Sequence, residues 1–366
     1  MKIAVAGGVT GGHIFPAVAV LQHFEKIYGK IEVLYFATPR GLENREIVRL
    51  FPEAMIKKLE IRGLIRPVYS PANVEIIRKS FLSYYECKKE LSKFKPDFSF
   101  ITGGYVSVPV GFASQKMGIP TFIHEQNAIA GLANKLIAKK ATKVFISFAE
   151  SARDFGIKNA HKIVHTGNPV REAILKDKSI FERFGINPNK KIILVSVGSM
   201  SAGSKFINRT MKGIYEKLDK NSSNNIEFLH SCAEEKYVDE FNKYSFVHAL
   251  KYIDDMHDYI ANCDAMISRG GATTVAEIIN YGTPSLVIPW SGASENHQLI
   301  NAISIEQKGA GYYLQENEVN IQSVMDIIGK ILDKNISRNI RKNLKTLKPK
   351  YEPAEKIFQD IISVIQ

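Results

Sequence analysis

The stretch Lys2-Ile3-Ala4-Val5-Ala6-Gly7-Gly8-Val9-Thr10-Gly11-Gly12-His13 joins an apolar run to a glycine-rich turn and a histidine. The second half repeats this pattern, where 263–267 leads into Ser268-Arg269-Gly270-Gly271-Ala272-Thr273-Thr274. Each copy reads as a buried strand, a tight turn and the start of an amphipathic helix. Backbone N–H groups at such a turn, together with a helix N-terminus, can bind an anion. The two copies therefore predict two α/β domains that face each other across a cleft, with phosphate chemistry between them.

The composition is that of a globular protein with two domains. At 366 residues the chain exceeds one ordinary hydrophobic core. Its apolar share of 45% and charged share of 23% are typical of soluble proteins. No apolar run approaches the roughly 20 residues that cross a bilayer, and no signal-peptide pattern precedes the first strand. Cys87, Cys232 and Cys263 show no disulfide or metal-ligand spacing, which fits a reducing cytosol.

The net charge of +12 is a second global feature. Such a bias fits an acidic partner, which could be nucleic acid, a nucleotide or an anionic membrane surface. The sequence has no pattern of a nucleic-acid-binding module, so we expect no nucleic-acid partner. Plain solubility is an equally open explanation of the charge.

Strands and helices alternate in both halves, which predicts an α/β fold with doubly wound parallel sheets. In the first half the expected strands are 2–6, 32–36, 97–102, 121–124 and 143–147, and the expected helices are 14–28, 42–51, 73–94, 108–117 and 132–139. In the second half the expected strands are 191–197, 227–230, 265–268, 285–289 and 311–314. From about Val319 the tail reads as helices only.

A Gly-Asn-Pro turn at 167–169 fits a hinge between the domains. We expect an N-terminal Rossmann-like domain over 1–167, a C-terminal one over 168–350, and a final helix over 351–366. That helix has an apolar stripe at helical spacing, formed by Ile357, Ile361, Ile362 and Ile365. Such a stripe must pack on a partner surface, and we expect the helix to return to the first domain.

The first glycine turn ends in His13. It lacks a clean Gly-x-Gly-x-x-Gly and is not followed by Gly-Lys-Ser/Thr, so it is neither a dinucleotide fingerprint nor a P-loop. His13 would stand near a helix N-terminus, where the helix dipole favours a neutral imidazole. A neutral imidazole can accept a proton from a sugar hydroxyl. The alternative is a helix-capping histidine packed against the sheet.

Two more polar clusters follow strands of the first half, at Thr102-Gly103-Gly104-Tyr105 and at His124-Glu125-Gln126-Asn127. The carboxyl ends of parallel strands are where open α/β sheets bind ligands. Capping of the next helix would explain Asn127 but leaves His124 and Glu125 unexplained.

In the second half, the helix that opens at 271–277 offers unblocked backbone amides and two threonine hydroxyls, which suit a diphosphate. Glu277 lies about one turn into this helix and can accept hydrogen bonds from two ribose hydroxyls. The alternative is a favourable charge near the helix N-terminus, worth about 0.3–1 kcal/mol. A further polar cluster at 295–298 (Glu-Asn-His-Gln) follows the strand that ends near Trp290.

Six of these motifs, in order over nearly the whole chain, resemble the MurG family of bacterial glycosyltransferases (glycosyltransferase family 28). The motifs are Gly-Gly-x-Thr-Gly-Gly-His13, Gly103–Ser107, His124–Asn127, Gly167–Arg171, Ser268–Ala272 and Asn296–Gln298. The resemblance implies a GT-B architecture of two Rossmann-like domains. It also implies inverting transfer of N-acetylglucosamine from UDP-N-acetylglucosamine (UDP-GlcNAc) in peptidoglycan synthesis. The acceptor would be the C4 hydroxyl of undecaprenyl-diphospho-MurNAc-pentapeptide (lipid I, converted to lipid II), at the cytoplasmic face of the cell membrane.

The resemblance further implies roles for single residues. His13 and Glu125 would be catalytic, with His13 as the base, and the acceptor side would include Gly103, Gly104, Tyr105 and His124. The donor site would take Thr10, Gly11, Gly12, Asn127 and Arg171 from the first domain. From the second domain it would take Ser201, Ile253, Ala272, Thr273, Thr274, Val275, Ala276, Glu277 and Gln298. Ile253 would meet uracil through its backbone, and Gln298 the sugar hydroxyls. No cofactor and no obligatory metal are expected.

The loop at 197–204 departs from the family pattern of Gly-Gly-Ser-x-Gly. The serine that contacts the donor could therefore be Ser199 or Ser201. Counting back from Asn208 favours Ser201.

A lipid acceptor requires the enzyme to reach the membrane surface. The segment 74–95 combines the apolar residues Val74, Ile77, Phe81 and Tyr85 with the cations Arg78, Lys79, Lys88 and Lys89. This mixture suits a peripheral contact with anionic lipid. An ordinary amphipathic helix packed on the sheet is equally open. Two rival functions also remain: a related glycosyltransferase with another acceptor, and a non-catalytic nucleotide-sugar-binding protein that would have no use for His13.

Overall fold

The computed structural model describes the whole chain except residues 66–68, 174–176, 199–200, 220–224 and 294–295. The described residues form two compact units. Unit 1 consists of residues 1–171 and 349–366, and unit 2 of residues 172–348. Each unit contains one parallel sheet, so the predicted doubly wound α/β class is confirmed. The chain passes from unit 1 to unit 2 after Arg171, close to the expected boundary at 167.

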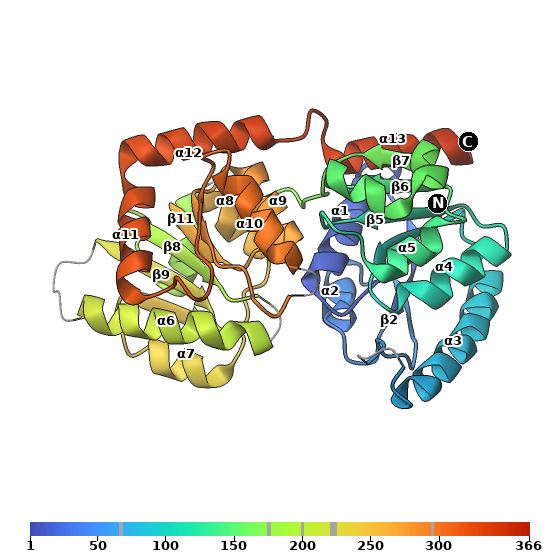
Figure 1. The fold of residues 1–366 in the computed structure, drawn as a ribbon, viewed down its shortest axis with the longest axis horizontal. Coiled ribbons are helices and arrows are strands. Elements are labelled where there is room, and N and C mark those ends of the chain that lie inside the picture. Colours follow the sequence, from blue (N-terminus) through green and yellow to red (C-terminus); the bar gives the residue numbers. More distant parts are fainter. Residues whose placement is uncertain (66–68, 174–176, 199–200, 220–224, 294–295) are drawn as a thin grey trace. The chain divides into compact units, whose positions relative to one another are not determined.

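Unit 1 has a seven-stranded sheet in the order β3-β2-β1-β4-β5-β6-β7, with helices on both faces (Figure 1). The strands are β1 (Lys2–Gly7), β2 (Glu32–Ala37), β3 (Met55–Lys58), β4 (Phe98–Gly103), β5 (Thr121–Glu125), β6 (Lys143–Ile146) and β7 (Ile163–His165). The helices are α1 (Gly11–Tyr28), α2 (Glu43–Leu50), α3 (Ala72–Phe94), α4 (Ser107–Lys116), α5 (Leu132–Ala138) and α13 (Pro353–Ile365).

Strand β1 shows why a parallel strand reads as an unbroken apolar run. Its side chains alternate between the two faces of the sheet. Ile3 and Val5 enter the core beneath α1 and α13, and Ala4 and Ala6 enter the core beneath α3, α4 and α5. Because both faces are covered, every position of the strand after Lys2 is buried and apolar.

Unit 2 has a six-stranded sheet in the order β10-β9-β8-β11-β12-β13. The strands are β8 (Lys191–Ser196), β9 (Ile226–Ser231), β10 (Val247–Leu250), β11 (Ala265–Ser268), β12 (Ser285–Val287) and β13 (Tyr312–Tyr313). The helices are α6 (Ser201–Asp219), α7 (Glu235–Phe241), α8 (Met256–Asn262), α9 (Ala272–Tyr281), α10 (His297–Glu306), α11 (Ile321–Leu332) and α12 (Lys334–Leu347).

Three strands, β3, β7 and β10, lie outside the predicted strand ranges, and all three are at sheet edges. β3 (Met-Ile-Lys-Lys) is half exposed, so it lacks an apolar run. β10 has only four residues and alternates between buried and partly buried positions. An edge strand needs less apolar sequence than a central one because one side faces solvent.

The terminal helix α13 packs against α1 inside unit 1. Ala354, Ile357 and Ile361 are buried in the same core as Phe24 of α1. The ring of Phe358 meets that of Phe24 edge to face, with 4.8 Å between centroids. The apolar stripe seen in the sequence therefore has a defined partner.

The strand order reverses once in each sheet, and this places the ligand-binding edge. In unit 1 the reversal falls between β1 and β4, and in unit 2 between β8 and β11. Open α/β sheets bind ligands beyond the carboxyl ends of the strands at such a point. The glycine turns after β1, β4 and β11 all stand there.

Candidate active site

The first glycine turn is held in an unusual backbone conformation. Val9 has a φ of 78°, a left-handed value that costs a β-branched residue free energy. Its N–H donates to Oε2 of Glu43 at 3.0 Å. The turn then passes through the extended N-cap Thr10 into α1, and no side chain caps the first turn of that helix. The turn thus delivers His13 into the first turn of α1, whose N-cap Thr10 makes no side-chain capping bond.

Glu43 is a buried site residue that sequence reasoning missed. Its other oxygen, Oε1, accepts hydrogen bonds from the N–H of Thr38 at 2.7 Å and from the Thr38 hydroxyl at 2.6 Å. The carboxylate therefore joins the loop after β2 to the turn after β1. In the sequence it looks like an ordinary acidic residue at the start of a helix, so no signal identifies this role.

His13 follows β1 and contacts residues at the carboxyl ends of β4 and β5, beside the point where the strand order reverses. Its Nδ1 is 2.9 Å from the carbonyl oxygen of Thr102 and 3.1 Å from Oε1 of Gln126. Its ring also lies against Gly103, where an added Cβ would stand 3.0 Å from Cε1 and Nδ1. Gly103 has a φ of 107°, so glycine is required there both for conformation and for space. The structure thus brings together three motifs that the sequence singled out separately.

His124 and Glu125 are both inside unit 1. His124 is fully buried, and its Nε2 lies 3.2 Å from the carbonyl oxygen of Gly167. Glu125 is 1% exposed, and its carboxylate accepts four hydrogen bonds within its own turn. The donors are Asn127 N (3.0 Å), Asn127 Nδ2 (3.2 Å), Gly131 N (2.9 Å) and Asn134 Nδ2 (2.8 Å). Both side chains are thus held by hydrogen bonds within unit 1, and the expected acceptor contact of His124 and catalytic role of Glu125 stay predictions.

Other expected site residues of unit 1 surround the glycine turn. Arg171 is 4% exposed, and its guanidinium lies over the ring of Phe15, 4.1 Å from the centroid. Because Phe15 is two residues beyond His13, Arg171 is held close to the first turn of α1. Gly104 has a φ of 80°, and an added Cβ there would lie 3.1 Å from the carbonyl oxygen of Gly8. Burial raises the pKa of the half-buried Tyr105.

In unit 2 the helix N-terminus of α9 is free of side-chain caps. Its N-cap is Gly271, extended at φ −66° and ψ 139°, which has no side chain to cap the first-turn amides. Thr273 is buried and Thr274 half-buried beside them. Glu277 is 6% exposed, one turn further along the same helix. Uncapped amides at a helix N-terminus are a binding site for an anion such as diphosphate.

Gln298 at the start of α10 is fixed against this turn. Its Oε1 accepts from the N–H of Trp290 at 3.0 Å. A Cβ on Gly270 would stand 2.4 Å from the Gln298 carbonyl oxygen, so the two backbones are in contact. Asn301 adds a bond from Nδ2 to the carbonyl oxygen of Gly270 at 3.0 Å. The segments after β11 and β12 are therefore locked together.

Arg269 organises the donor-side loops of unit 2 and was given no role from the sequence. It is 6% exposed and donates to two backbone carbonyls, those of Gly203 (Nε, 3.1 Å) and Ile288 (Nη1, 3.1 Å). Its Nη1 also pairs with Glu316 at 2.8 Å. The first turn of α6, the residue after β12 and the segment after β13 are thus tied to one guanidinium.

Two predictions concern residues that are only partly described. Ser199 lies outside the described residues. Ser201 begins α6, and its side chain lies outside the described part of the structure, so the choice between the two serines stays a prediction. Ile253 is 3% exposed, with its side chain in the core of unit 2, so only its backbone is available to a ligand.

None of the helices in the described part of the chain is long and apolar enough to cross a membrane. Within the same residues, no three His, Cys, Asp or Glu side chains are grouped as metal ligands would be.

Two parallel-sheet units, each with a glycine turn and an uncapped helix N-terminus where its strand order reverses, define a glycosyltransferase of the GT-B fold. A crystal structure of Acinetobacter baumannii MurG has this fold, with a TM-score of 0.70, 24% identity and 99% coverage of each chain. Residues 3–146 match the glycosyltransferase family 28 N-terminal domain, and residues 192–363 match the C-terminal domain of that family. The chain belongs to glycosyltransferase family 28.

Relatives from two bacteria are similar over their whole length. The Thermosipho africanus protein is 42% identical over 363 residues, covering 99% of this chain and 98% of its own. The Thermotoga petrophila protein is 38% identical over 365 residues, covering 100% of this chain and 99% of its own. Both are named UDP-N-acetylglucosamine–N-acetylmuramyl-(pentapeptide) pyrophosphoryl-undecaprenol N-acetylglucosamine transferase.

Proposed function

We propose that this chain transfers N-acetylglucosamine from UDP-GlcNAc to the C4 hydroxyl of MurNAc-pentapeptide on undecaprenyl diphosphate. The names of the full-length relatives and the family membership support this substrate pair. The observation that carries the chemistry is the geometry of His13. Its Nδ1 is held between two acceptor oxygens, and among the described residues nothing is bonded to Nε2.

The reaction requires one base and stabilisation of a leaving diphosphate. His13 Nε2 would take the proton of the acceptor hydroxyl as its oxygen attacks the anomeric carbon from the face opposite UDP. The bond to UDP breaks in the same step, which inverts the anomeric configuration. Amides of Ala272 to Thr274 and the guanidinium of Arg171 would stabilise the charge that develops on UDP.

The donor is assigned to unit 2 and the base to unit 1. Glu277 would accept from the ribose hydroxyls, the Ile253 backbone would meet uracil, and Gln298 would bind the sugar. Gln298 is suited to this because its Oε1 is already bonded to Trp290, which leaves its amide N–H groups to donate to a ligand. His13 is the proposed base, and Glu125, the second residue predicted to be catalytic, accepts hydrogen bonds from Asn127, Gly131 and Asn134.

UDP release with and without a lipid I analogue tests the function. We expect release that depends on the acceptor, and a fall in turnover of about 10²–10⁴ for His13→Ala with UDP affinity retained. Glu277→Ala should show the opposite pattern, a weaker affinity for UDP-GlcNAc. UDP release that is equal with and without acceptor would refute the transfer reaction. Release with a different lipid acceptor alone would identify a related glycosyltransferase.

We also propose that α3 brings the enzyme to the cytoplasmic face of the membrane as a peripheral protein. Its apolar residues Val74, Ile77, Phe81 and Tyr85 are 71%, 61%, 61% and 53% exposed. The side of α3 that packs on the unit is a different one, formed by residues such as Cys87 and Leu91. The four residues are therefore not explained as an ordinary packed face.

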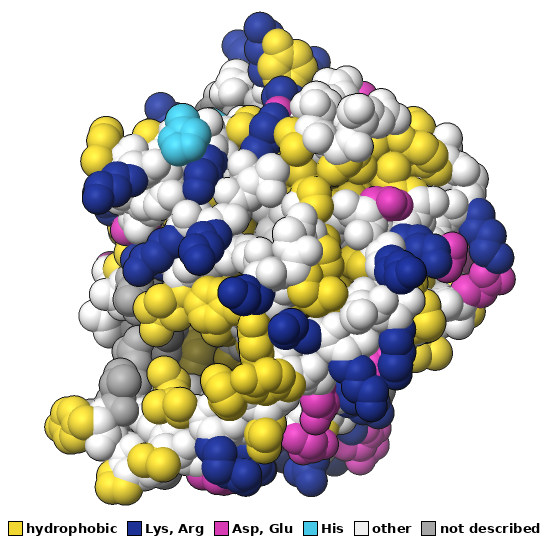
Figure 2. Space-filling model, turned by 90° about the vertical axis from the view of Figure 1, so that its right-hand side faces the viewer, with side chains coloured by type: hydrophobic (Ala, Val, Ile, Leu, Met, Phe, Trp, Pro, Cys, Tyr) yellow, Lys and Arg dark blue, Asp and Glu magenta, His cyan; other side chains and the backbone are white. Residues whose placement is uncertain are grey.

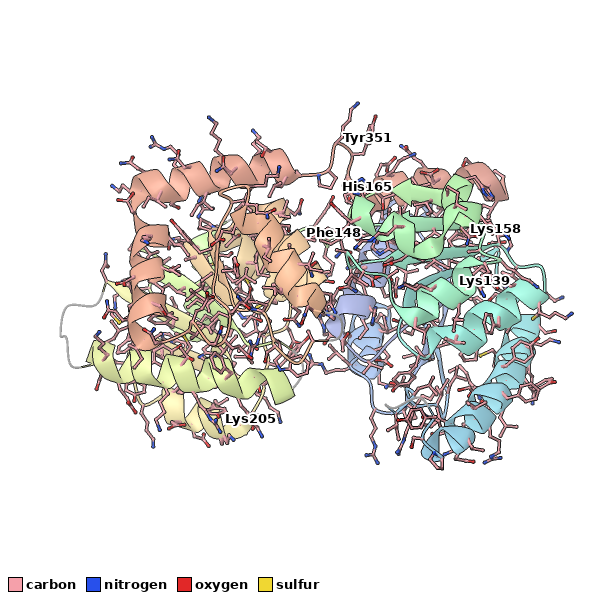
Figure 3. All side chains as sticks on the ribbon, in the orientation of Figure 1. Lys139, Phe148, Lys158, His165, Lys205 and Tyr351 are labelled. Atoms are coloured by element: carbon pink, nitrogen blue, oxygen red, sulfur yellow. The ribbon has the colours of Figure 1, made fainter. Side chains whose placement is uncertain are left out.

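Cations accompany this apolar surface. Figure 2 shows hydrophobic side chains gathered on this face of unit 1 with lysine and arginine around them. Lys139 and Lys158 of the same unit, labelled in Figure 3, are exposed as well. Apolar side chains that enter the interface, with lysines near anionic headgroups, are the combination that holds peripheral proteins on membranes.

Vesicles of anionic lipid test the membrane contact. Phe81→Asp removes a large apolar side chain and adds a like charge, so we expect about 10- to 100-fold weaker binding. Val364→Asp, at a 40% exposed position of α13, is the matched control and should bind as the parent does. Binding that is unaffected by Phe81→Asp, or by salt, would exclude α3 as the membrane contact.

A further inference from the structure

His13 is the first member of a hydrogen-bonded chain whose protons are fixed by backbone carbonyl groups. The carbonyl oxygen of Thr102 lies 2.9 Å from Nδ1 of His13. A carbonyl oxygen can only accept, so Nδ1 carries the proton. In the neutral ring the lone pair then lies on Nε2, which is the nitrogen that can act as a base.

The amide of Gln126 has its orientation fixed in the same way. Its Nε2 lies 3.1 Å from the carbonyl oxygen of His124, and only the NH₂ group can donate there. Oε1 therefore faces Nδ1 of His13, at 3.1 Å. If the amide turned over, an NH₂ group would face the protonated Nδ1 and two oxygens would face each other. Gln126 thus accepts from His13 in its stable orientation.

His124 completes the chain. Its Nε2 lies 3.2 Å from the carbonyl oxygen of Gly167, so Nε2 carries the proton and Nδ1 is the acceptor. That Nδ1 receives the second N–H of the Gln126 amide at 3.1 Å. Complete burial lowers the pKa of His124 to about 4. The ring therefore stays neutral and keeps its acceptor at any pH near neutrality.

We propose that Gln126 and His124 are positioning residues that hold His13 in the tautomer protonated on Nδ1, with His124 acting through the amide of Gln126. The three carbonyls of Thr102, His124 and Gly167 leave one consistent assignment of every proton in the chain. The value of this tautomer rests on the proposed function, in which Nε2 takes a hydroxyl proton. After that transfer the imidazolium keeps its Nδ1–H bonds to Thr102 and Gln126, which become charge-assisted and stronger.

The tautomer can be read directly by long-range ¹H–¹⁵N NMR of the full chain labelled on its histidine rings. The His13 signals are those that disappear in His13→Ala. At a pH where the ring is neutral, we expect the parent to show a protonated Nδ1 and an unprotonated Nε2. Gln126→Leu should show a larger share of the tautomer protonated on Nε2, because one of the two acceptors that hold the Nδ1 proton is lost. This readout does not depend on activity.

Kinetics separate positioning from a merely structural role. For Gln126→Leu we expect kcat to fall roughly 10- to 100-fold with the KM for UDP-GlcNAc nearly unchanged. Gln115→Leu is the matched control, since that amide donates only to the carbonyl oxygen of Ile137 at 2.8 Å, away from the histidine. It should leave the spectrum and kcat unchanged.

A conservative pair at His124 tests the relay itself. In His124→Asn the amide oxygen can replace Nδ1 as acceptor for Gln126, whereas His124→Leu offers no acceptor. Both lose the bond to Gly167, so their stabilities should be similar. We expect His124→Asn to restore most of the kcat that His124→Leu loses.

Three results would overturn the proposal: a parent His13 protonated on Nε2, a Gln126→Leu variant with the parent's spectrum, or equal kcat values for the His124 pair. The proposed function fails on a different result, a His13→Ala variant that turns over at the parent's rate. In that case the NMR spectrum would still report the proposed tautomer of His13, so failure of the proposed function is distinguished from failure of the tautomer proposal.

Discussion

Glu43 offers the sharpest test of how the glycine turn is held. Glu43→Gln keeps the shape of the side chain but changes one of its two oxygens into an NH₂ group. The remaining oxygen can still accept both hydrogen bonds from Thr38, which lie at 2.7 and 2.6 Å. The NH₂ group then faces the N–H of Val9, so two donors oppose each other. The substitution therefore releases the turn and leaves the rest of the loop bonded.

The expected loss follows from the bonds that change. The bond from Val9 N–H to the carboxylate is 3.0 Å long, and a hydrogen bond to a charged group contributes about 1.5–3 kcal/mol. The two bonds from Thr38 are kept, but their acceptor is now a neutral amide oxygen, which weakens each bond by a fraction of that amount. Val9 also keeps its left-handed φ of 78° only while the turn is held. We therefore expect unfolding free energy to fall by about 2–3 kcal/mol.

Urea unfolding and initial rates of UDP release measure the two consequences. Because the turn leads directly to His13, we expect kcat to fall about tenfold or more. Glu46→Gln is the control: Glu46 is equally buried on α2 but pairs with Arg45 (2.6 Å) and Arg49 (3.0 Å), away from the turn. It should lose stability and keep kcat. Equal kcat values for the two variants would show that the turn does not depend on Glu43.

Two further expectations follow from buried groups. Burial lowers the pKa of His124 to about 4 and that of His230 to about 3, so both are neutral in the fold but protonate in the unfolded chain below about pH 6.5. The unfolding free energy is therefore unaffected by these two groups above pH 6.5. It falls as the pH drops toward 4 for His124 and toward 3 for His230, by about 2 kcal/mol for each at pH 5. The urea midpoint should be lower at pH 5 than at pH 7.5, and this difference should be smaller for His230→Asn than for the parent. An unchanged difference would show that His230 does not contribute to the pH dependence. Separately, Gly270→Ala places a Cβ 2.4 Å from the Gln298 carbonyl oxygen, so Gln298 must shift. We expect UDP-GlcNAc to bind at least tenfold more weakly, as measured by calorimetry. Gly329→Ala, with nothing within 4 Å, should bind as the parent does, and equal affinities would show that this backbone contact is unimportant.

The sequence predicts the central strands and the glycine turns because each has a local cause. A strand buried on both faces, such as β1, must be apolar at every position. A turn at the end of such a strand needs glycine wherever φ is positive, as at Gly103 and Gly104. The edge strands β3, β7 and β10 escape prediction because an edge imposes no such pattern.

The roles of single polar residues were harder to predict because they depend on contacts between distant segments. Gln126 stands between two notable residues in the sequence, yet its bond to His13 joins positions 113 residues apart. Arg269 is within a recognised motif, but its partner Gly203 lies 66 residues away. Charge and hydrogen-bonding capacity are visible in a sequence, whereas the partner that uses them is set by the strand order.

Glycines at the points where the strand order reverses also have a steric role in the structure. In unit 1, Gly103 gives room to the ring of His13, and in unit 2, Gly270 gives room to the backbone of Gln298. In both units a glycine after a strand at the reversal point lets a residue from another element approach within contact distance. Anion binding is then left to the amides of the helix N-termini, which need no side chain. The glycines set where the functional side chains stand, so substitution of Gly103 should lower turnover through His13, and substitution of Gly270 should lower affinity through Gln298.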